Sequence, residues 1–376
     1  MTSVPTSPGA TEAGHRALLA DSVASFTGRG TDVTRARRWR GLPEEYDRTA
    51  WRQMASLGWL GILVPERYGG LGLGLAEAAI VAEGLARSLA PEPYTASAVL
   101  AARALLAGED GSLKDELLPQ VVTGALIPAL AWQEQAGNLD CGAVETVAMP
   151  FEGGYRVNGI KRFIAGAAGA DGFLVTARLG PSVVLLWVPR GSTGVQCSLE
   201  PLADGRHFGT LALNDVVVSR GHLAGSAAGV ADALDDALVI VGAELNGVMG
   251  RALDMSLDYL KSRVQFGKPI GTFQALQHRA VDLYIQRELA SAVLNEAVRA
   301  MDNGADLLTR AKWASRVKAR CAAAAAKITR ETIQLHGAIG FTDEFDAGLY
   351  LKRSLVLSAW LGSATHHRRR YAALTA

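Results

Sequence analysis

The sequence has few cysteines, no long apolar run and no excess of charge of either sign. Its three cysteines, Cys141, Cys197 and Cys321, lie far apart and lack any CxxC or Cys/His spacing, which excludes a disulfide framework and a zinc site. Thirty-eight Lys and Arg balance 37 Asp and Glu, so no global field attracts nucleic acid or an anionic membrane. No run of eighteen apolar residues and no apolar leader segment occurs. We therefore expect a protein of the reducing cytoplasm that binds any anionic ligand locally.

The texture of the sequence changes twice along its 376 residues, a length that predicts two or three domains. Residues 1–14 are rich in Ser, Thr, Pro and Gly and are expected to form a disordered tail. Apolar residues at helical spacing then predict a helical domain over 15–125. Short β-branched runs separated by Gly, Pro and Asp predict an antiparallel β domain over 126–226. Long helical patterns over 227–376 predict a four-helix bundle, so the expected fold class is α+β.

Within these domains several boundaries can be read directly. The glycine cluster at Gly69–Gly74 is too dense for a helix interior and predicts a turn there. In the C-terminal part, the apolar spacing predicts four helical stretches: Val230–Ser262, Gln274–Asn303, Leu307–His336 and a last one from Ala347 onward.

One connection between two of these helices has residues that suit an anion-binding site. Arg263 begins the segment RVQFGKPIGTFQALQH, which ends at His278 and in which Gly267, Pro269 and Gly271 set a turn. A guanidinium beside the exposed amides of a helix N-terminus suits a phosphate or pyrophosphate. Taken alone, the segment is better explained as an ordinary turn between two helices with a surface arginine.

Four motifs in the same order along the chain resemble those of the acyl-CoA dehydrogenase family. The segment from Arg263 resembles the signature RxxFGxxIxxFQ, and Leu57–Gly72 resembles LGxxGLxxPxxYGG. Asn158–Ile164 resembles the NGxKxWI strand, and Gln334–Phe341 resembles the QxxGGxGF turn. Four ordered matches over nearly the whole chain make coincidence a poor explanation. The resemblance implies a helical domain, a β domain and a second helical domain around an FAD.

The same resemblance implies which residues contact FAD from a neighbouring subunit. Arg263 and Phe266 would hold the pyrophosphate and adenosine, with Gln274 beside them. Gln334 and Gly337 would meet the adenine half, because a glycine turn lets the backbone approach the dinucleotide. The second glycine of this family turn is replaced by an alanine in the present chain.

In the β domain the chain departs further from the family pattern. Gln133 stands where the family has Thr, and Phe163 stands where it has the Trp against the flavin ring. Ala165 replaces the Thr whose hydroxyl meets flavin N5. We expect these three residues to line an altered flavin pocket, although Phe163 and the neighbouring Trp132 also fit a role as core aromatics.

The dehydrogenation that the resemblance implies needs a carboxylate to remove the α-proton of the thioester. Both positions at which the family carries this base are apolar here, namely Leu361 and Ala237. Glu244 lies seven residues beyond Ala237, on nearly the same helix face, among apolar neighbours. We therefore predict Glu244 as the base. The alternative is that Glu244 pairs with a buried arginine such as Arg251, or with another chain.

Three hypotheses of function follow from the resemblance. The first is an FAD enzyme that oxidises an acyl-CoA to its trans-2-enoyl form, in a homo- or hetero-tetramer, with electron-transfer flavoprotein or a similar acceptor. The second is a catalytically silent partner subunit that completes the FAD site of a sister chain. The third is a flavin monooxygenase on the same fold. A looser resemblance to small subunits of heteromeric enzymes acting on pimeloyl-CoA or steroid side chains accompanies the first two. No metal, nucleic acid or membrane span is expected.

Overall fold

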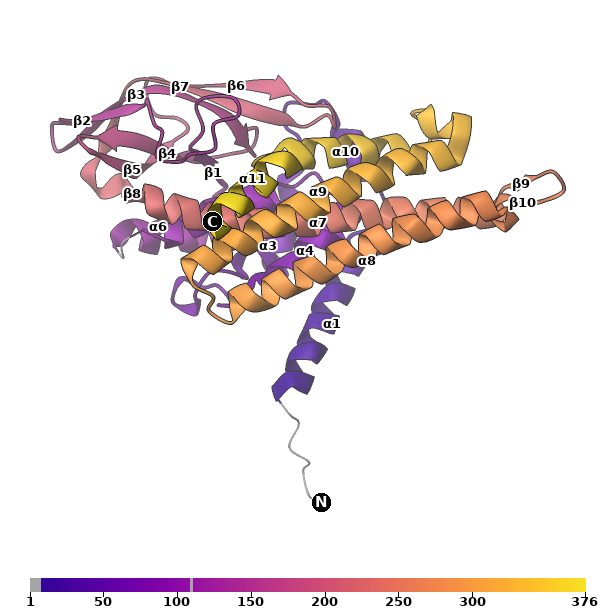
Figure 1. Ribbon diagram of the computed structural model, residues 1–376. Coiled ribbons are helices and arrows are strands. Elements are labelled where there is room, and N and C mark those ends of the chain that lie inside the picture. Colours follow the sequence, from indigo (N-terminus) through magenta and orange to yellow (C-terminus); the bar gives the residue numbers. More distant parts are fainter. Residues whose placement is uncertain (1–7, 109–110) are drawn as a thin grey trace.

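Helices dominate both ends of the chain, and a β-sheet separates them in sequence. The computed structural model describes residues 8–108 and 111–376. The predicted tail 1–14 lies partly outside these residues, and its described part, from Pro8, already belongs to the first helix. A proline is favoured in the first helical turn, where its missing N–H is not needed. Figure 1 shows the helical parts stacked beneath the sheet.

The N-terminal helical part is built of short elements. Its α-helices are α1 (Pro8–Phe26), α2 (Thr34–Trp39), α3 (Arg48–Ser56), α4 (Leu75–Arg87), α5 (Ala102–Leu106) and α6 (Ser112–Val122). Single turns of 3₁₀-helix form η1 (Gly28–Gly30), η2 (Trp59–Gly61) and η3 (Glu66–Tyr68), and η4 (Tyr94–Ala101) is a π-helix. The predicted turn at Gly69–Gly74 is confirmed, since Gly69 has φ +82° and α4 begins directly afterwards.

The middle of the chain forms an eight-stranded sheet in the order β6-β7-β3-β2-β4-β5-β8, with β1 paired to β4. Its strands are β1 (Pro128–Ala131), β2 (Val147–Phe151), β3 (Gly154–Ala165), β4 (Gly172–Leu179), β5 (Ser182–Pro189), β6 (Val195–Pro201), β7 (His207–Ser219) and β8 (Leu223–Ser226). A 3₁₀ turn, η5 (Arg220–His222), precedes β8. The sheet is antiparallel as predicted except where β4 runs parallel to β1 and β2.

The C-terminal part is a bundle of long helices. These are α7 (Ala227–Ser262), α8 (Gln274–Asp302), α9 (Leu307–His336), α10 (Ala347–Ala359) and α11 (Ala364–Thr375). Strands β9 (Val264–Gln265) and β10 (Lys268–Pro269) and the turn η6 (Ile270–Thr272) connect α7 to α8, and η7 (Gly337–Phe341) follows α9. The last predicted helix is thus two helices. It breaks because Leu361 and Gly362 have φ of +57° and +102°, which a helix cannot contain.

Helix α7 joins the two helical parts into one core. It packs against α4 and η4 on one side and against α8 and α9 on the other. A carboxylate strengthens this junction, because Asp302 at the end of α8 accepts hydrogen bonds from the first backbone N–H groups of α4, at Leu75 (2.8 Å) and Ala76 (3.0 Å). A second core lies within the sheet, around Phe173 and Val216.

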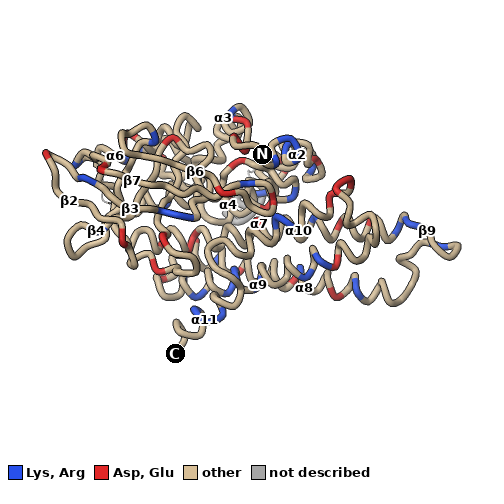
Figure 2. Tube along the Cα trace, turned by 90° about the horizontal axis from the view of Figure 1, so that it is seen from above, with Lys and Arg blue, Asp and Glu red and all other residues tan. Residues whose placement is uncertain are grey.

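The charged residues are spread over the whole molecule. Basic and acidic residues lie side by side along the trace (Figure 2). Within the described residues, no helix combines the length and the apolar character needed to cross a membrane.

Candidate active site

The connection from α7 to α8 is an exposed hairpin at the far end of the bundle (Figure 1). Arg263 closes it, because its carbonyl accepts a 2.8 Å hydrogen bond from the backbone N–H of Ile270. At its tip Phe266 has φ +54° and is 92 % exposed, so an aromatic ring is presented to solvent on a strained backbone. Gln274, also exposed, begins α8 directly after the hairpin.

The turn that follows α9 lies at the same end of the bundle. The ring of His336 stacks 4.5 Å from that of Tyr259, one helical turn before Arg263. Gln334 is exposed in the last turn of α9, and Gly337 follows with φ +64° and no atom within 4 Å of where a Cβ would stand. The structure therefore brings the five predicted residues of the C-terminal part to one exposed end of the bundle.

The three predicted flavin-ring residues meet in the β domain. The backbone N–H of Arg162 donates to the carbonyl of Gln133 (2.8 Å), which aligns the segment after β1 with β3. Phe163 has φ +57° and lies where the pairing of β3 with β7 shifts register, between Lys161 and Ile164. Ala165 ends β3 two residues later.

These two groups of residues lie at opposite ends of one chain (Figure 1), so a single chain does not close them around one dinucleotide. Each group nevertheless suits FAD: an arginine, an exposed aromatic ring and an open glycine turn at one end, and a half-buried aromatic strand at the other. An FAD that used both groups would have to lie between two chains.

A buried ion pair stabilises the part of the sheet that carries the three predicted flavin-ring residues. Lys161 is fully buried and its Nζ lies 2.6 Å from Oε1 of Glu134, while Thr146 also donates to that carboxylate. Burial lowers the pKa of Lys161 to about 8, against the opposing effect of Glu134. Glu134 therefore connects the end of β1 to β3 and to the start of β2.

Glu244, the predicted base, is hydrogen-bonded through both carboxylate oxygens. Nη2 of Arg353 donates to Oε2 (2.6 Å), and Oγ1 of Thr95 donates to Oε1 (2.5 Å). Arg353 also donates to Asp204 (3.0 Å), in the loop between β6 and β7. The buried-arginine alternative thus finds a partner in α10 rather than in Arg251. Whether Glu244 also acts as a base stays a prediction.

Glu244 faces a small charged cavity of about 50 Å³ that Ala165 and Trp360 also line. Two further carboxyl groups in its wall, Glu45 and Glu92, have pKa values raised above the ordinary range, mainly by burial. Their partners are His207 and Arg35, respectively. This cavity joins the N-terminal helices, the sheet and the bundle.

A second cavity of about 90 Å³ lies on the other side of the turn between α10 and α11. It is lined by Leu361 from that turn, by Trp132, by Leu238 and by Asp235. Asp235 is the one carboxylate among the described residues that line this cavity, and Arg370 donates to it (2.6 Å).

The acidic pair Asp235 and Asp236 does not cap the start of α7. α7 begins at Ala227, two turns earlier, so both carboxylates lie inside the helix. They are buried and paired with arginines instead: Asp236 with Arg103 (2.7 Å) and with Arg310.

Sequence reasoning missed Arg353, Thr95 and Asp204. Their separation from Glu244 along the chain hides the contact, although an arginine among the apolar residues of α10 is itself a signal of a buried cation.

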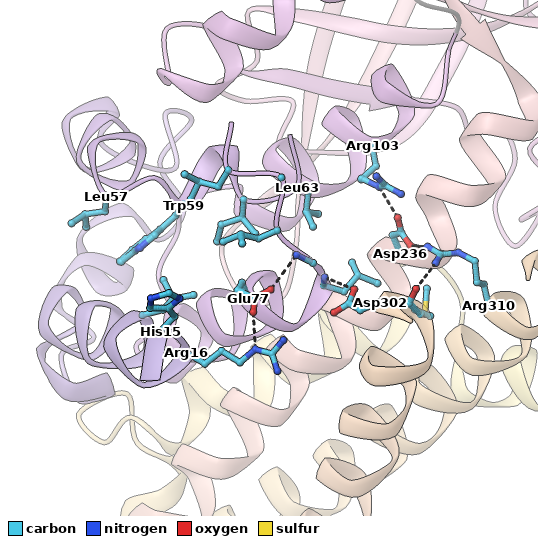
Figure 3. Close-up of a pocket in the computed structure, with 18 residues that line it drawn as sticks. His15, Arg16, Leu57, Trp59, Leu63, Glu77, Arg103, Asp236, Asp302 and Arg310 are labelled. Atoms are coloured by element: carbon cyan, nitrogen blue, oxygen red, sulfur yellow. Dashed lines mark hydrogen bonds and ion pairs between the residues drawn. The ribbon is translucent and has the colours of Figure 1, made fainter. Parts of the chain in front are cut away.

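A third cavity, about 620 Å³ and the largest of these three, lies apart from the other two, between α1, the segment 57–75 and the bundle. Figure 3 shows Arg103 and Arg310 pointing at Asp236 on one wall, and Arg16 bound to Glu77 on another. Its rim carries exposed leucines, namely Leu57, Leu71 and Leu73.

Comparison with known proteins gives the family. Residues 14–125 match the family described as "Acyl-CoA dehydrogenase, N-terminal domain", and residues 214–374 match "Acyl-CoA dehydrogenase, C-terminal domain". The chain is 31 % identical over 344 residues to acyl-CoA dehydrogenase IpdE2 of Mycobacterium tuberculosis, covering 90 % of each chain. It resembles the solved structure of a variant of the Tcur3481–Tcur3483 steroid ACAD (TM-score 0.87, 29 % identity, 96 % and 98 % covered).

A second similar structure is the ChsE4–ChsE5 complex of Mycobacterium tuberculosis (TM-score 0.85, 26 % identity, 95 % and 96 % covered). The family matches together span most of the chain, and the ordered motifs and the fold agree with them. The chain therefore belongs to the acyl-CoA dehydrogenase family of flavoprotein oxidoreductases.

Proposed function

We propose that the chain is a subunit of an FAD-dependent enzyme that oxidises an acyl-CoA thioester to its trans-2-enoyl form. In this proposal Arg263, Phe266, Gln274, Gln334 and Gly337 of one chain and Gln133, Phe163 and Ala165 of another hold the FAD. When bound, FAD would accept the β-hydrogen of the substrate as hydride.

One observation carries this proposal. Among the described residues, eight non-glycine residues have positive φ, and three of them are Phe163, Phe266 and Leu361. The family resemblance places Phe163 at the flavin ring, Phe266 at the flavin phosphates and Leu361 at the usual position of the base. Such backbone costs of order 1–3 kcal/mol per residue and clusters at active sites and ligand clamps.

Glu244 is the proposed base, and it would take the α-proton onto a carboxylate oxygen. The cavity that it faces also contains Ala165, the residue expected at the reactive end of the flavin ring. Arg353 and Thr95 hold and orient the carboxylate in this cavity through these two hydrogen bonds.

The same contacts favour a second candidate, a silent partner subunit. Both oxygens of this carboxylate are already engaged by Arg353 and Thr95, and Leu361 leaves the usual base position apolar. The similarity to two structures named as pairs of chains, Tcur3481–Tcur3483 and ChsE4–ChsE5, supports a heteromeric assembly for either candidate.

The remaining parts of the proposal concern substrate, acceptor and location. The similar structure named a steroid ACAD supports a steroid or fatty acyl side chain as substrate. Reduced flavin needs an electron acceptor, for which we propose electron-transfer flavoprotein or a similar protein. The exposed Leu57, Leu71 and Leu73 around the largest cavity would suit such a protein, because clustered surface leucines mark contact sites. We propose a cytoplasmic location, with which the free thiols agree.

Product analysis tests the proposal. The purified enzyme is incubated with a panel of acyl-CoAs and an artificial electron acceptor, and mass spectrometry detects thioesters that have lost two hydrogens. We expect product from the wild type, a loss of at least about 100-fold for Glu244→Gln, and little change for Asp235→Asn. Loss in Asp235→Asn instead would move the base to the second cavity. No product from any form would contradict the proposed dehydrogenation and leave the partner-subunit and monooxygenase hypotheses.

A further inference from the structure

Lys318 is a buried lysine that the proposed reaction does not yet use. It lies in the middle of α9, is fully buried, and has no carboxylate within ion-pair distance among the residues that the structure describes. Its Nζ donates instead to two backbone carbonyls, those of Ser358 (3.0 Å) and Gly362 (2.6 Å). A lysine is rarely buried without a charged partner, so this position calls for a reason.

The two carbonyls flank the turn between α10 and α11, which carries Trp360 and Leu361. A third carbonyl of the same stretch, that of Leu361, accepts a 2.7 Å hydrogen bond from Nε2 of His367, which is also buried. Side chains from α9 and α11 therefore hold the backbone of this turn on both sides of a residue with φ +57°.

The held turn faces both cavities of the candidate site. Trp360 lines the cavity of Glu244, and Leu361 lines the cavity of Trp132 and Leu238. The backbone N–H of Leu361 has no hydrogen-bond acceptor among the described residues. A donor held in place without an acceptor is suited to a carbonyl oxygen that a ligand brings.

We propose that Lys318 is a positioning residue for the acyl thioester, which fixes the turn 358–362 so that the substrate carbonyl meets a preformed backbone donor. This proposal rests on the proposed function. Lys318 does not touch the substrate: it acts through the carbonyls of Ser358 and Gly362. His367 in α11 holds the same turn through its hydrogen bond to the carbonyl of Leu361. We call these contacts of Lys318 and His367 with the turn the clamp.

A purely structural role is the competing explanation, and the chain offers a matched control for it. Lys114 is 4 % exposed, and its Nζ donates to the carbonyls of Leu106 (2.7 Å) and Gly108 (2.5 Å) at the end of α5. Like Lys318, Lys114 donates to two backbone carbonyls, but it lines neither cavity. Loss of either lysine should lower the melting temperature.

The experiment compares Lys318→Met, Lys318→Gln and Lys114→Met in the FAD-loaded enzyme, with melting temperature, flavin content, kcat and KM measured for each. We expect Lys318→Met to lower kcat/KM by about 10- to 100-fold at unchanged flavin content, as loss of supporting hydrogen bonds does elsewhere. Lys318→Gln should recover part of this loss, because an amide still donates two N–H bonds. Lys114→Met should stay within about twofold of the wild type. Equal kinetics in Lys318→Met and Lys114→Met would overturn the proposal.

Two safeguards keep the test decisive. If Lys318→Met does not fold, the comparison uses Lys318→Gln against Lys114→Gln. If the wild type itself oxidises no acyl-CoA, the proposed dehydrogenation fails, and the clamp is tested by calorimetry of acyl-CoA binding. Weaker binding in Lys318→Met than in Lys114→Met would then support the positioning role, and equal binding would refute it.

Discussion

Nη2 of Arg353 donates a 2.6 Å hydrogen bond to Oε2 of Glu244, and this contact ties α10 to α7 in the middle of the molecule. The same guanidinium reaches Asp204 on the loop of the sheet. The residue predicted as the base is therefore also part of a buried charge network that joins all three parts of the chain.

Removal of Arg353 should destabilise the fold strongly. Its side chain is 10 % exposed, and Arg353→Met would leave Glu244 and Asp204 buried without their shared cation. Loss of one partner of a buried pair costs about 3–5 kcal/mol. Urea unfolding should give this decrease in the free energy of unfolding. Arg299→Met, which breaks an exposed pair with Glu296, serves as the control. Equal free energies of unfolding for the two variants would show that the buried network stabilises the fold no more than the exposed pair does.

A carboxylate introduced at Leu361 should create or raise dehydrogenase activity. Leu361 occupies the usual base position and faces the cavity of Trp132 and Leu238. In a Glu244→Gln background, Leu361→Glu should turn over acyl-CoA faster than Leu361→Gln, because only a carboxylate can accept the α-proton. The rate of flavin reduction in a stopped-flow instrument measures this. Identical rates would mean that substrate does not reach this turn.

Stability should rise with pH through the titration of Lys318. Burial lowers its pKa to about 7 in the folded chain, from 10.5 for an exposed lysine. Between these values the unfolded chain binds more protons than the folded chain, so the free energy of unfolding rises with pH, and the gain is lost as the pH falls to about 7. The free energy of unfolding of the wild type, relative to that of Lys318→Met, should therefore rise by roughly 1.4 kcal/mol per pH unit at most. Denaturant unfolding at several pH values tests this, and a constant difference would contradict it.

Phe266 should matter for flavin and not for folding. Because its ring is 92 % exposed, Phe266→Ala should change the free energy of unfolding by no more than about 0.5 kcal/mol. The amount of FAD that copurifies per chain should nevertheless fall, since the ring is proposed to contact a cofactor shared with another chain. Leu18→Ala, at a 68 % exposed position in α1, is the control. Unaltered flavin content would show that Phe266 does not contribute to flavin binding.

The sequence allowed more of the fold than of the site to be predicted. Helix α9 was predicted with both of its ends, Leu307 and His336, because its apolar spacing and its glycine stop are local signals. The break at Leu361 was not predicted, because it depends on contacts from Lys318 and His367. The partner of Glu244 was missed for the same reason: Arg353 lies 109 residues away along the chain, and only the folded chain brings the two together.

The most direct test is the visible spectrum of the purified wild-type enzyme during an anaerobic titration with acyl-CoA. The account predicts a bound yellow flavin that is bleached by substrate, and bleaching that is lost in Glu244→Gln. A flavin that stays oxidised with every acyl-CoA offered, or a chain that purifies without flavin even with its partner, would contradict the proposed dehydrogenation.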